Sequence, residues 1–294
     1  MPKSIIFLIL VVCVTCYTGQ TFFNKLFSVN YKGSANAATP VYAVLYGLIV
    51  STVTLLLAGL RFSPSRETVI LGCINGVILF FYNVGMIYAS RTGPYALHSI
   101  VMLFGSIVVC LVFSALYWGD HLTLVQMTGI GVMLLAFVAF NSGGIDFHSV
   151  KKGYFFWVVS LFFTNGFYGV LMDAQQRIHI SERNEMIVIT FFASAAVSFL
   201  YLLATQKSQA LQAFRMERNT WGFVIGSSFG AAFAVYTLMV LLAYIPSYIL
   251  YTINNGSILV LSAILCAVIL KERMTKMTIT GIALSVLSII LLSI

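Results

Sequence analysis

The chain has 294 residues, of which 60% are hydrophobic and only 8% charged, with a net charge of +8 and a mean hydropathy of +1.00. Soluble domains normally carry about a quarter of charged residues, so this composition excludes a water-soluble globular protein. The 16 lysines and arginines are scattered over many segments and form no stripe with interleaved aromatics, which argues against nucleic acid as a partner. The lipid bilayer is therefore expected to be the solvent of this chain.

Ten apolar segments follow one another along the chain, each close to the ~20 residues that are needed to cross the hydrocarbon layer. They cover residues 4–24, 38–60, 68–89, 95–117, 122–140, 154–173, 186–205, 220–243, 247–270 and 277–294. The first follows Lys3 but has no small-residue cleavage pattern after it, so we expect a retained helix and not a signal peptide. The connections are too short for a separate soluble domain, and the sequence predicts an all-α membrane protein with ten transmembrane helices.

The two halves of the chain resemble each other. The pattern from Gly119 through Gly129 returns 152 positions later as Lys271 through Gly281, and the same offset pairs Pro94 with Pro246. We therefore predict a first five-helix repeat at 1–141, a linker rich in glycine and charge at 142–153, and a second five-helix repeat at 154–294. Because five is odd, the second repeat enters the membrane from the opposite side, and such inverted repeats are typical of secondary transporters.

Proline and threonine mark where several helices begin. Pro94 and Pro246 precede the fourth and ninth segments, where a missing N–H has no cost because the first helical turn has unpaired donors. Thr123 and Thr275 precede the fifth and tenth segments and are expected to be N-caps.

Glycine spacing predicts which helices approach closely. Gly72 and Gly76 in the third segment, and Gly226 and Gly230 in the eighth, have the GxxxG spacing that lets backbones touch. The fifth and tenth segments lack a polar face, so we expect them to face lipid or a second copy of the chain, and a homodimer is left open.

Polar side chains inside a bilayer are costly without partners, so their positions are the best guide to a binding site. They gather in the first, third, fourth, sixth and ninth segments, whereas the second, fifth, seventh and tenth are nearly bare. The predicted substrate-binding residues are Tyr17, Gln20, Asn24, Tyr82, Asn83, His98, Ser99, Asn165, Tyr168, Tyr251, Asn254 and Asn255.

The ninth segment places polar groups on one helical face. Tyr248, Tyr251 and Asn255 are three and then four residues apart, and the repeat offset pairs Tyr251 with Ser99 of the fourth segment. We expect these two helices to face each other across a common cavity that binds a polar small-molecule substrate. The alternative is that the amides and hydroxyls only connect neighbouring helices.

Titratable groups are scarce within the segments. His98 is either a proton carrier or a packing residue, and Asp173 with its neighbour Arg177 is expected near the membrane interface, with no acid in the middle of any segment. Cys13 and Cys16 have metal-ligand spacing but no histidine or carboxylate nearby, so we predict no metal and no cofactor.

Ten segments in halves of five, with an acid, a Thr and a Thr-Gly pair at Asp120 to Ile130 and Glu272 to Ile282, resemble the EamA-like branch of the drug/metabolite transporter superfamily. The resemblance covers nearly the whole chain. It implies a ten-helix inverted-repeat bundle whose cavity is lined by the first, third, fourth, sixth, eighth and ninth helices. Superfamily members often keep both termini in the cytoplasm, whereas the lysine and arginine count favours termini outside, so the orientation stays open.

The resemblance and the polar segments together predict a carrier of a small polar or amphipathic metabolite that works by alternating access. A multidrug exporter is the neighbouring alternative. A non-transporting membrane scaffold and an intramembrane enzyme are the alternatives from other classes, and the isolated Ser, His and Asp residues within the segments argue against an enzyme. The expected location is the cell (inner) membrane of a bacterium.

Overall fold

The computed structural model describes residues 1–141, 150–269 and 274–293, and its helices confirm the predicted all-α membrane class. Most of the predicted linker, at residues 142–149, lies outside the described residues, as do Lys271, Glu272 and Arg273 of the second motif.

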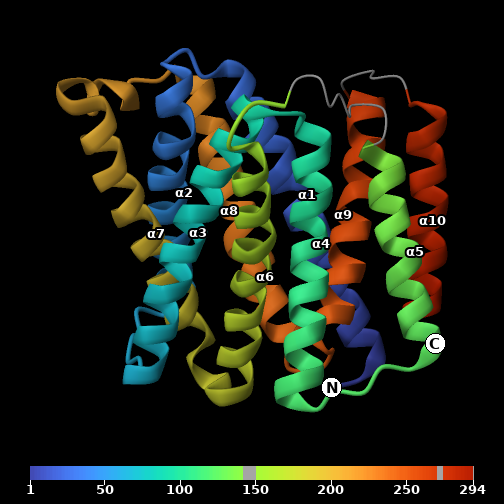
Figure 1. Cartoon of the computed structure of the whole chain (residues 1–294). Helices are drawn as coiled ribbons and strands as arrows, with labels where there is room; N and C mark the ends of the chain where they lie inside the picture. Colours follow the sequence, from blue (N-terminus) through green and yellow to red (C-terminus); the bar gives the residue numbers. More distant parts are fainter. Residues whose placement is uncertain (142–149, 270–273, 294) are drawn as a thin grey trace. The chain divides into compact units, whose positions relative to one another are not determined.

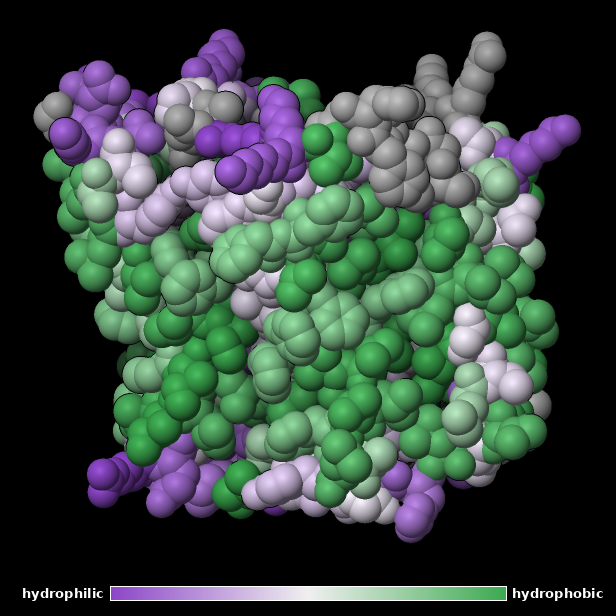
Figure 2. All heavy atoms as spheres, viewed as in Figure 1, coloured by the Kyte–Doolittle hydropathy of each residue, from purple (hydrophilic) through white to green (hydrophobic). Residues whose placement is uncertain are grey.

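The helices correspond in order to the ten predicted segments (Figure 1). They are α1 (Lys3–Asn30), α2 (Ala35–Leu57), α3 (Arg66–Thr92), α4 (Tyr95–Phe113), α5 (Leu124–Asn141), α6 (Tyr154–Ile178), α7 (Arg183–Gln206), α8 (Arg218–Leu241), α9 (Ser247–Ile269) and α10 (Lys276–Ser293). In the described part of the chain, 9 helices are long and apolar enough to cross a membrane, and α10 is a shorter apolar helix. Figure 2 shows apolar side chains over the middle of the visible face and hydrophilic ones near the helix ends, as a protein with several membrane spans requires.

The predicted helix starts are confirmed. Thr123 Oγ1 accepts a hydrogen bond from the Gln126 N–H (3.2 Å), and the Gln126 side chain accepts one from the Thr123 N–H (3.2 Å), which caps α5. Thr275 Oγ1 accepts the N–H of Thr278 at 3.1 Å and caps α10 in the same way. Pro94 is the N-cap of α4, as its position before an apolar run indicated.

The helices form two compact units. Unit 1 comprises Tyr88–Val170 and Tyr244–Ile294 together with Met1, and unit 2 comprises Pro2–Ile87 and Leu171–Ala243. Unit 1 contains α4, α5, α9 and α10, and unit 2 contains α1, α2, α7 and α8, while α3 and α6 each pass from one unit into the other. Each unit thus combines helices from both sequence halves, so the contacts divide the chain differently from the predicted repeats 1–141 and 154–294, whose boundaries stay a prediction.

Within unit 1, α5 and α10 pack side by side (Figure 1). Gly129 lies against Leu292 and Gly281 lies against Phe140, while the Ser288 hydroxyl donates to the Gly129 carbonyl oxygen at 2.6 Å. These contacts show that the two helices run antiparallel. The offset of 152 relates Gly129 to Gly281 and Phe140 to Leu292. The contact of Gly129 with Leu292 and the contact of Gly281 with Phe140 are therefore equivalent, with the two repeats exchanged.

Unit 2 shows the same relation between α2 and α7. Gly47 lies against Ala195, and one turn further along α2 the hydroxyl of Ser51 lies 3.2 Å from the carbonyl oxygen of Val188. The residue numbers on α7 fall as those on α2 rise, so α2 and α7 run antiparallel. These two helices are related by the repeat offset, as α5 and α10 are. Equivalent helices that run in opposite directions in both units confirm the inverted relation between the repeats.

The close approaches predicted from GxxxG spacing are present. Gly72 and Gly76 of α3 face α7, and a Cβ at either position would meet α7 atoms closer than ordinary van der Waals contact. Gly226 and Gly230 of α8 face α1, where a Cβ on Gly230 would lie 3.1 Å from the carbonyl oxygen of Cys16. Small residues therefore let these helices come near enough for backbone atoms to touch.

The closest approach among these glycines involves a pair that the spacing did not reveal. A Cβ on Gly105 of α4 would overlap the backbone carbonyl of Phe162 on α6, and one on Gly166 of α6 would overlap Val109 of α4. Neither glycine has a second glycine four residues away on its own helix, so no GxxxG spacing marks them. Glycine is needed at both positions because α4 crosses α6 there and leaves no room for a Cβ.

We expect Gly105→Ala to lower the free energy of unfolding by about 1–3 kcal/mol, because the added methyl group meets backbone atoms that cannot rotate away. Gly131→Ala in α5 is the matched control, since a Cβ there meets nothing within 4 Å. The control should unfold like wild type or slightly later, because alanine favours the helix more than glycine. Denaturation of purified protein in mixed micelles measures both, and equal stability of the two variants would contradict the packing.

Candidate functional site

The predicted substrate-binding residues divide between the two units. Unit 1 contains His98, Ser99, Asn165, Tyr168, Tyr251, Asn254 and Asn255, and unit 2 contains Tyr17, Gln20, Asn24, Tyr82 and Asn83. Each set is described within its own unit.

In unit 1, side-chain amides of α6 and α9 reach toward α4. Asn165 donates from Nδ2 to the carbonyl oxygen of Met102 at 2.9 Å, and Asn255 donates from Nδ2 to Ser106 Oγ at 2.9 Å. Both asparagines are only half-buried, and within the described part of the chain neither Oδ1 accepts a hydrogen bond from the protein. Each amide is thus oriented by its NH₂ group and keeps an acceptor oxygen available.

The tyrosines of α9 are more deeply buried than these amides. Tyr251 is 5% exposed and its hydroxyl donates to the carbonyl oxygen of Gly169 on α6 at 3.4 Å, while Tyr248 and Asn254 are also buried. Tyr168 is half-buried on α6. Ser106, Asn165, Tyr251 and Asn255, which hydrogen-bond α4, α6 and α9 to one another, are called the α4–α6–α9 seam below.

The fourth and ninth helices contact each other at two places, and the cavity predicted between them stays a prediction. Besides the Asn255–Ser106 bond, the hydroxyls of Ser114 and Ser247 lie 3.3 Å apart, so α4 and α9 are in direct contact. The physical reason is that polar groups in hydrocarbon have no water to bind and gain most by meeting each other.

His98 is fully buried on α4. Its Nε2 lies 3.4 Å from Ser90 Oγ, and its ring lies edge-on to that of Tyr154, whose hydroxyl donates to the Pro94 carbonyl oxygen at 2.8 Å. These contacts favour the packing alternative over a proton carrier. The neighbouring Ser99 is also buried, and its hydroxyl has no hydrogen-bond partner among the described residues.

In unit 2, Gln20 belongs to a polar cluster with α2 and α8. It donates from Nε2 to the Tyr46 hydroxyl at 3.4 Å, and its backbone oxygen accepts from the Ser227 hydroxyl at 3.2 Å. Ser227 Oγ also lies 2.5 Å from the Tyr42 hydroxyl, and the rings of Tyr42 and Tyr46 stack with centroids 5.2 Å apart. The expectation of a nearly bare second segment is therefore wrong, and the i, i+4 spacing of the two tyrosines was the signal that could have revealed it.

The other predicted residues of unit 2 differ in burial. Asn24 is exposed near the end of α1, whereas Tyr17, Tyr82 and Asn83 are half-buried. Their role in binding stays a prediction.

Asp173 of α6 is 2% exposed and thus buried within the protein, and its expected position near the membrane interface stays a prediction. The Arg177 guanidinium donates from Nε to Asp173 Oδ1 at 3.2 Å one turn along the helix. Gln175 is also fully buried and donates from Nε2 to Thr68 Oγ1 at 2.9 Å. Gln176 is 2% exposed, and neither of its amide atoms has a hydrogen-bond partner in the described residues.

The predicted sixth segment ended at residue 173, whereas α6 continues to Ile178 and so includes Gln175 and Gln176. The hydrogen bond from Gln175 to Thr68 connects this end of α6 to α3.

Residues 152–294 match the model of the EamA-like transporter family. The second half of the chain is thus similar to this family of transporters. A match over the second half and the fold described above confirm the resemblance seen in the sequence. No curated protein matches this EamA-like chain.

Among solved structures, 29 chains match this fold. One is a crystal structure that aligns with 97% of this chain and 98% of its own, with a TM-score of 0.78 and 18% sequence identity. At this identity the likeness shows the fold alone, and it covers both halves of the chain.

We expect Ser106→Ala and Asn255→Ala to be coupled in their effect on stability. Each variant removes the same hydrogen bond between α4 and α9, so the double variant should lose less free energy of unfolding than the sum of the single ones, by about 0.6–1.7 kcal/mol. A double-mutant cycle in mixed micelles measures this difference. Strict additivity would show that the bond does not hold the two helices together.

Proposed function

We propose that the protein is a carrier in the cell (inner) membrane of a bacterium that moves a small polar or amphipathic metabolite by alternating access. The observation that carries the proposal is the antiparallel packing of equivalent helices, α5 with α10 in unit 1 and α2 with α7 in unit 2. Inverted repeats allow two nearly equivalent packings of one bundle, each open to one side of the membrane. The family match, which is to transporters, supports the same conclusion.

The chemistry of the α4–α6–α9 seam supports a neutral or zwitterionic substrate. Its side chains are two amides, a phenol and a hydroxyl, none of which is ionised at neutral pH. The available Oδ1 atoms of Asn165 and Asn255 accept hydrogen bonds, so they suit a substrate with hydroxyl, amide or ammonium donors. Asp173, a buried carboxylate of unit 2, is paired with Arg177 and offers no unbalanced negative charge for a lipophilic cation.

A multidrug exporter is the second candidate, and the aromatic cluster of unit 2 is the observation that favours it. The stacked rings of Tyr42 and Tyr46 could receive a flat or cationic drug through stacking or cation–π contact. A scaffold without transport would use the amides only as helix connectors. An enzyme is not favoured, because the matching family is one of transporters.

A thermal-shift screen of the purified protein distinguishes these candidates. A metabolite that binds only the folded protein should stabilise it by about 2.7 kcal/mol at 100 times its dissociation constant, whereas lipophilic cations should shift the melting temperature little. The reverse pattern would support the exporter. A pool of metabolites and drugs without any stabilising member would favour the scaffold.

Transport by reconstituted protein tests the role of Asn255 directly. We expect Asn255→Ala to reduce uptake of the stabilising metabolite by about tenfold or more, because a buried substrate donor loses its acceptor. Ser106→Ala is the matched control, since it removes the same interhelical bond and retains the amide. Ser106 is buried and serves as the partner of Asn255, not as a substrate contact, so transport by this variant should stay within about twofold of wild type. If both variants lose the same amount of transport at equal amounts of folded protein, Asn255 only connects the two helices and does not bind the substrate.

A further inference from the structure

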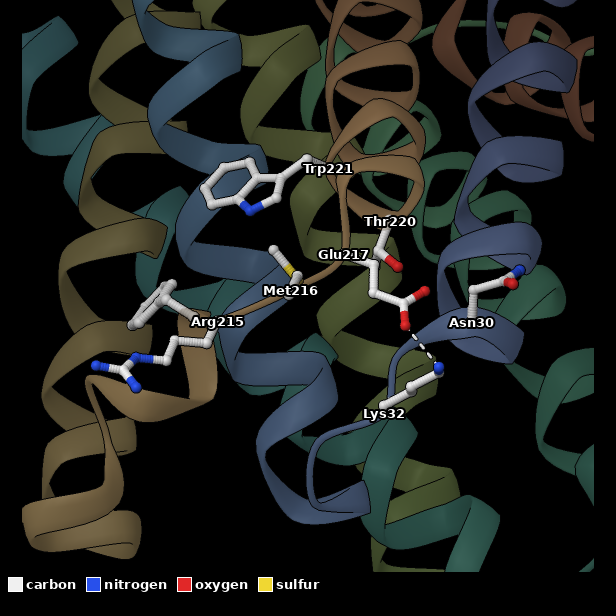
Figure 3. A pocket seen from close by; sticks show the side chains of 8 residues that line it. Asn30, Lys32, Arg215, Met216, Glu217, Thr220 and Trp221 are labelled. Atoms are coloured by element: carbon white, nitrogen blue, oxygen red, sulfur yellow. Dashed lines mark hydrogen bonds and ion pairs between the residues drawn. The ribbon is translucent and has the colours of Figure 1, made fainter.

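The segment between α7 and α8 forms a pocket with the end of α1 (Figure 3). The pocket has a volume of about 470 Å³, within the range of small-molecule sites. It is lined by Asn30, Lys32, Phe214, Arg215, Met216, Glu217, Thr220 and Trp221. All of them belong to unit 2, and they lie where α1 ends and α8 begins. The pocket is thus expected at the boundary between hydrocarbon and water, and none of the predicted substrate-binding residues lines it.

Three charged side chains surround this pocket, and only two of them neutralise each other. The Lys32 ammonium donates to Glu217 Oε1 at 2.5 Å, and this hydrogen bond, together with the negative charge of Glu217, raises the pKa of Lys32. Arg215 is exposed, and its guanidinium forms no hydrogen bond or ion pair with any described residue, whereas its backbone N–H donates to the Gln212 carbonyl oxygen at 3.0 Å. Figure 3 shows its guanidinium on the other side of Met216 from the Lys32–Glu217 pair. The lining therefore has a net charge of +1 and one guanidinium free to bind an anion.

The remaining lining is apolar and suits lipid. Phe214, Met216 and Trp221 are half-buried, and an indole at a helix end is typical of the membrane–water interface. Leu211 in the same connection is 70% exposed, which is costly in water and favourable against acyl chains. The lining thus combines a guanidinium, an indole and apolar groups, which suit the phosphate, the glycerol region and the acyl chains of a phospholipid.

The surroundings of the pocket add positive charge. Lys207 at the end of α7 and Arg218 at the start of α8 are both exposed at this end of unit 2. Basic residues next to the membrane attract anionic lipids, by about 1 kcal/mol for each charge near the surface. The Lys32–Glu217 pair leaves little attraction for the ammonium of a zwitterionic headgroup, so an anionic lipid is favoured.

We propose that this pocket binds the phosphodiester headgroup of an anionic phospholipid such as phosphatidylglycerol. Arg215 binds the phosphate through two parallel N–H donors, which is the geometry that a guanidinium offers to phosphate oxygens. Trp221 lies beside the glycerol region, and Leu211 contacts the first part of an acyl chain. The site is separate from the proposed transport function and does not depend on it.

Native mass spectrometry of the full chain in detergent tests the site with defined lipids. Wild type should bind the first phosphatidylglycerol about tenfold more tightly than Arg215→Ala does, and more tightly than it binds phosphatidylethanolamine. Arg218→Ala is the matched control, because it removes the same charge at the same end of unit 2 from a residue outside the lining. It should weaken phosphatidylglycerol binding by at most about fivefold, which corresponds to about 1 kcal/mol of general attraction from one charge, and so by less than Arg215→Ala does.

A variant of opposite sign excludes misfolding as the cause. Glu217→Gln raises the charge of the lining and should tighten phosphatidylglycerol binding, which a damaged fold could not do. Soluble glycerol 3-phosphate tests whether the site binds a lipid or any phosphate. It should neither bind to the protein nor displace the lipid. Equal weakening by Arg215→Ala and Arg218→Ala, no tightening in Glu217→Gln, or displacement by glycerol 3-phosphate would each overturn the proposal.

Discussion

The structure depends on one constraint, which is that hydrocarbon offers no hydrogen-bond partner to any polar group. The backbone meets this constraint by forming long helices, and the polar side chains meet it by bonding to neighbouring helices. Asn165 and Asn255 illustrate the result, since both direct their NH₂ groups to α4. The same need brings α4 and α9 into direct contact and joins Gln20 to the tyrosines of α2. The hydrogen bonds that satisfy the polar side chains therefore also determine which helices pack together.

Gene duplication provides the second organising feature, and it acts through small residues. Gly129 and Gly281 are equivalent by sequence offset, and each lets its helix approach the other copy of the same helix. A contact that is repeated from both copies in this way needs the two helices to run in opposite directions. Because α2 and α7 obey the same rule in the other unit, the inversion belongs to the whole chain. The compact units then form between the copies, and neither sequence half packs as a separate body.

Charge and hydrogen-bonding capacity are distributed by depth. Amides, phenols and hydroxyls lie within the spans, where an ionised group would be disfavoured by several kcal/mol. The exposed ion pair of Lys32 and Glu217, and the free guanidinium of Arg215, lie at a helix end, where water and lipid headgroups solvate them. Asp173 is a charge buried within the protein near the end of α6, and Arg177 one turn along the helix supplies the opposite charge that burial requires. The proposed metabolite site and the proposed lipid site thus use different chemistry because they lie in different solvents.

The sequence by itself determined the class, the order of the helices and several of their starts. Hydropathy and spacing act locally, so Thr123 and Thr275 could be recognised as caps, and Gly72 with Gly76 as a face for close packing, without knowledge of any neighbour. Only the tertiary structure decided which helix each face meets. Gly105 became necessary because α6 crosses there, and Gln175 is buried where its amide meets Thr68 of α3. A helical period assigns each residue to a face, but the partner of that face comes from segments far away along the chain, which no local pattern contains.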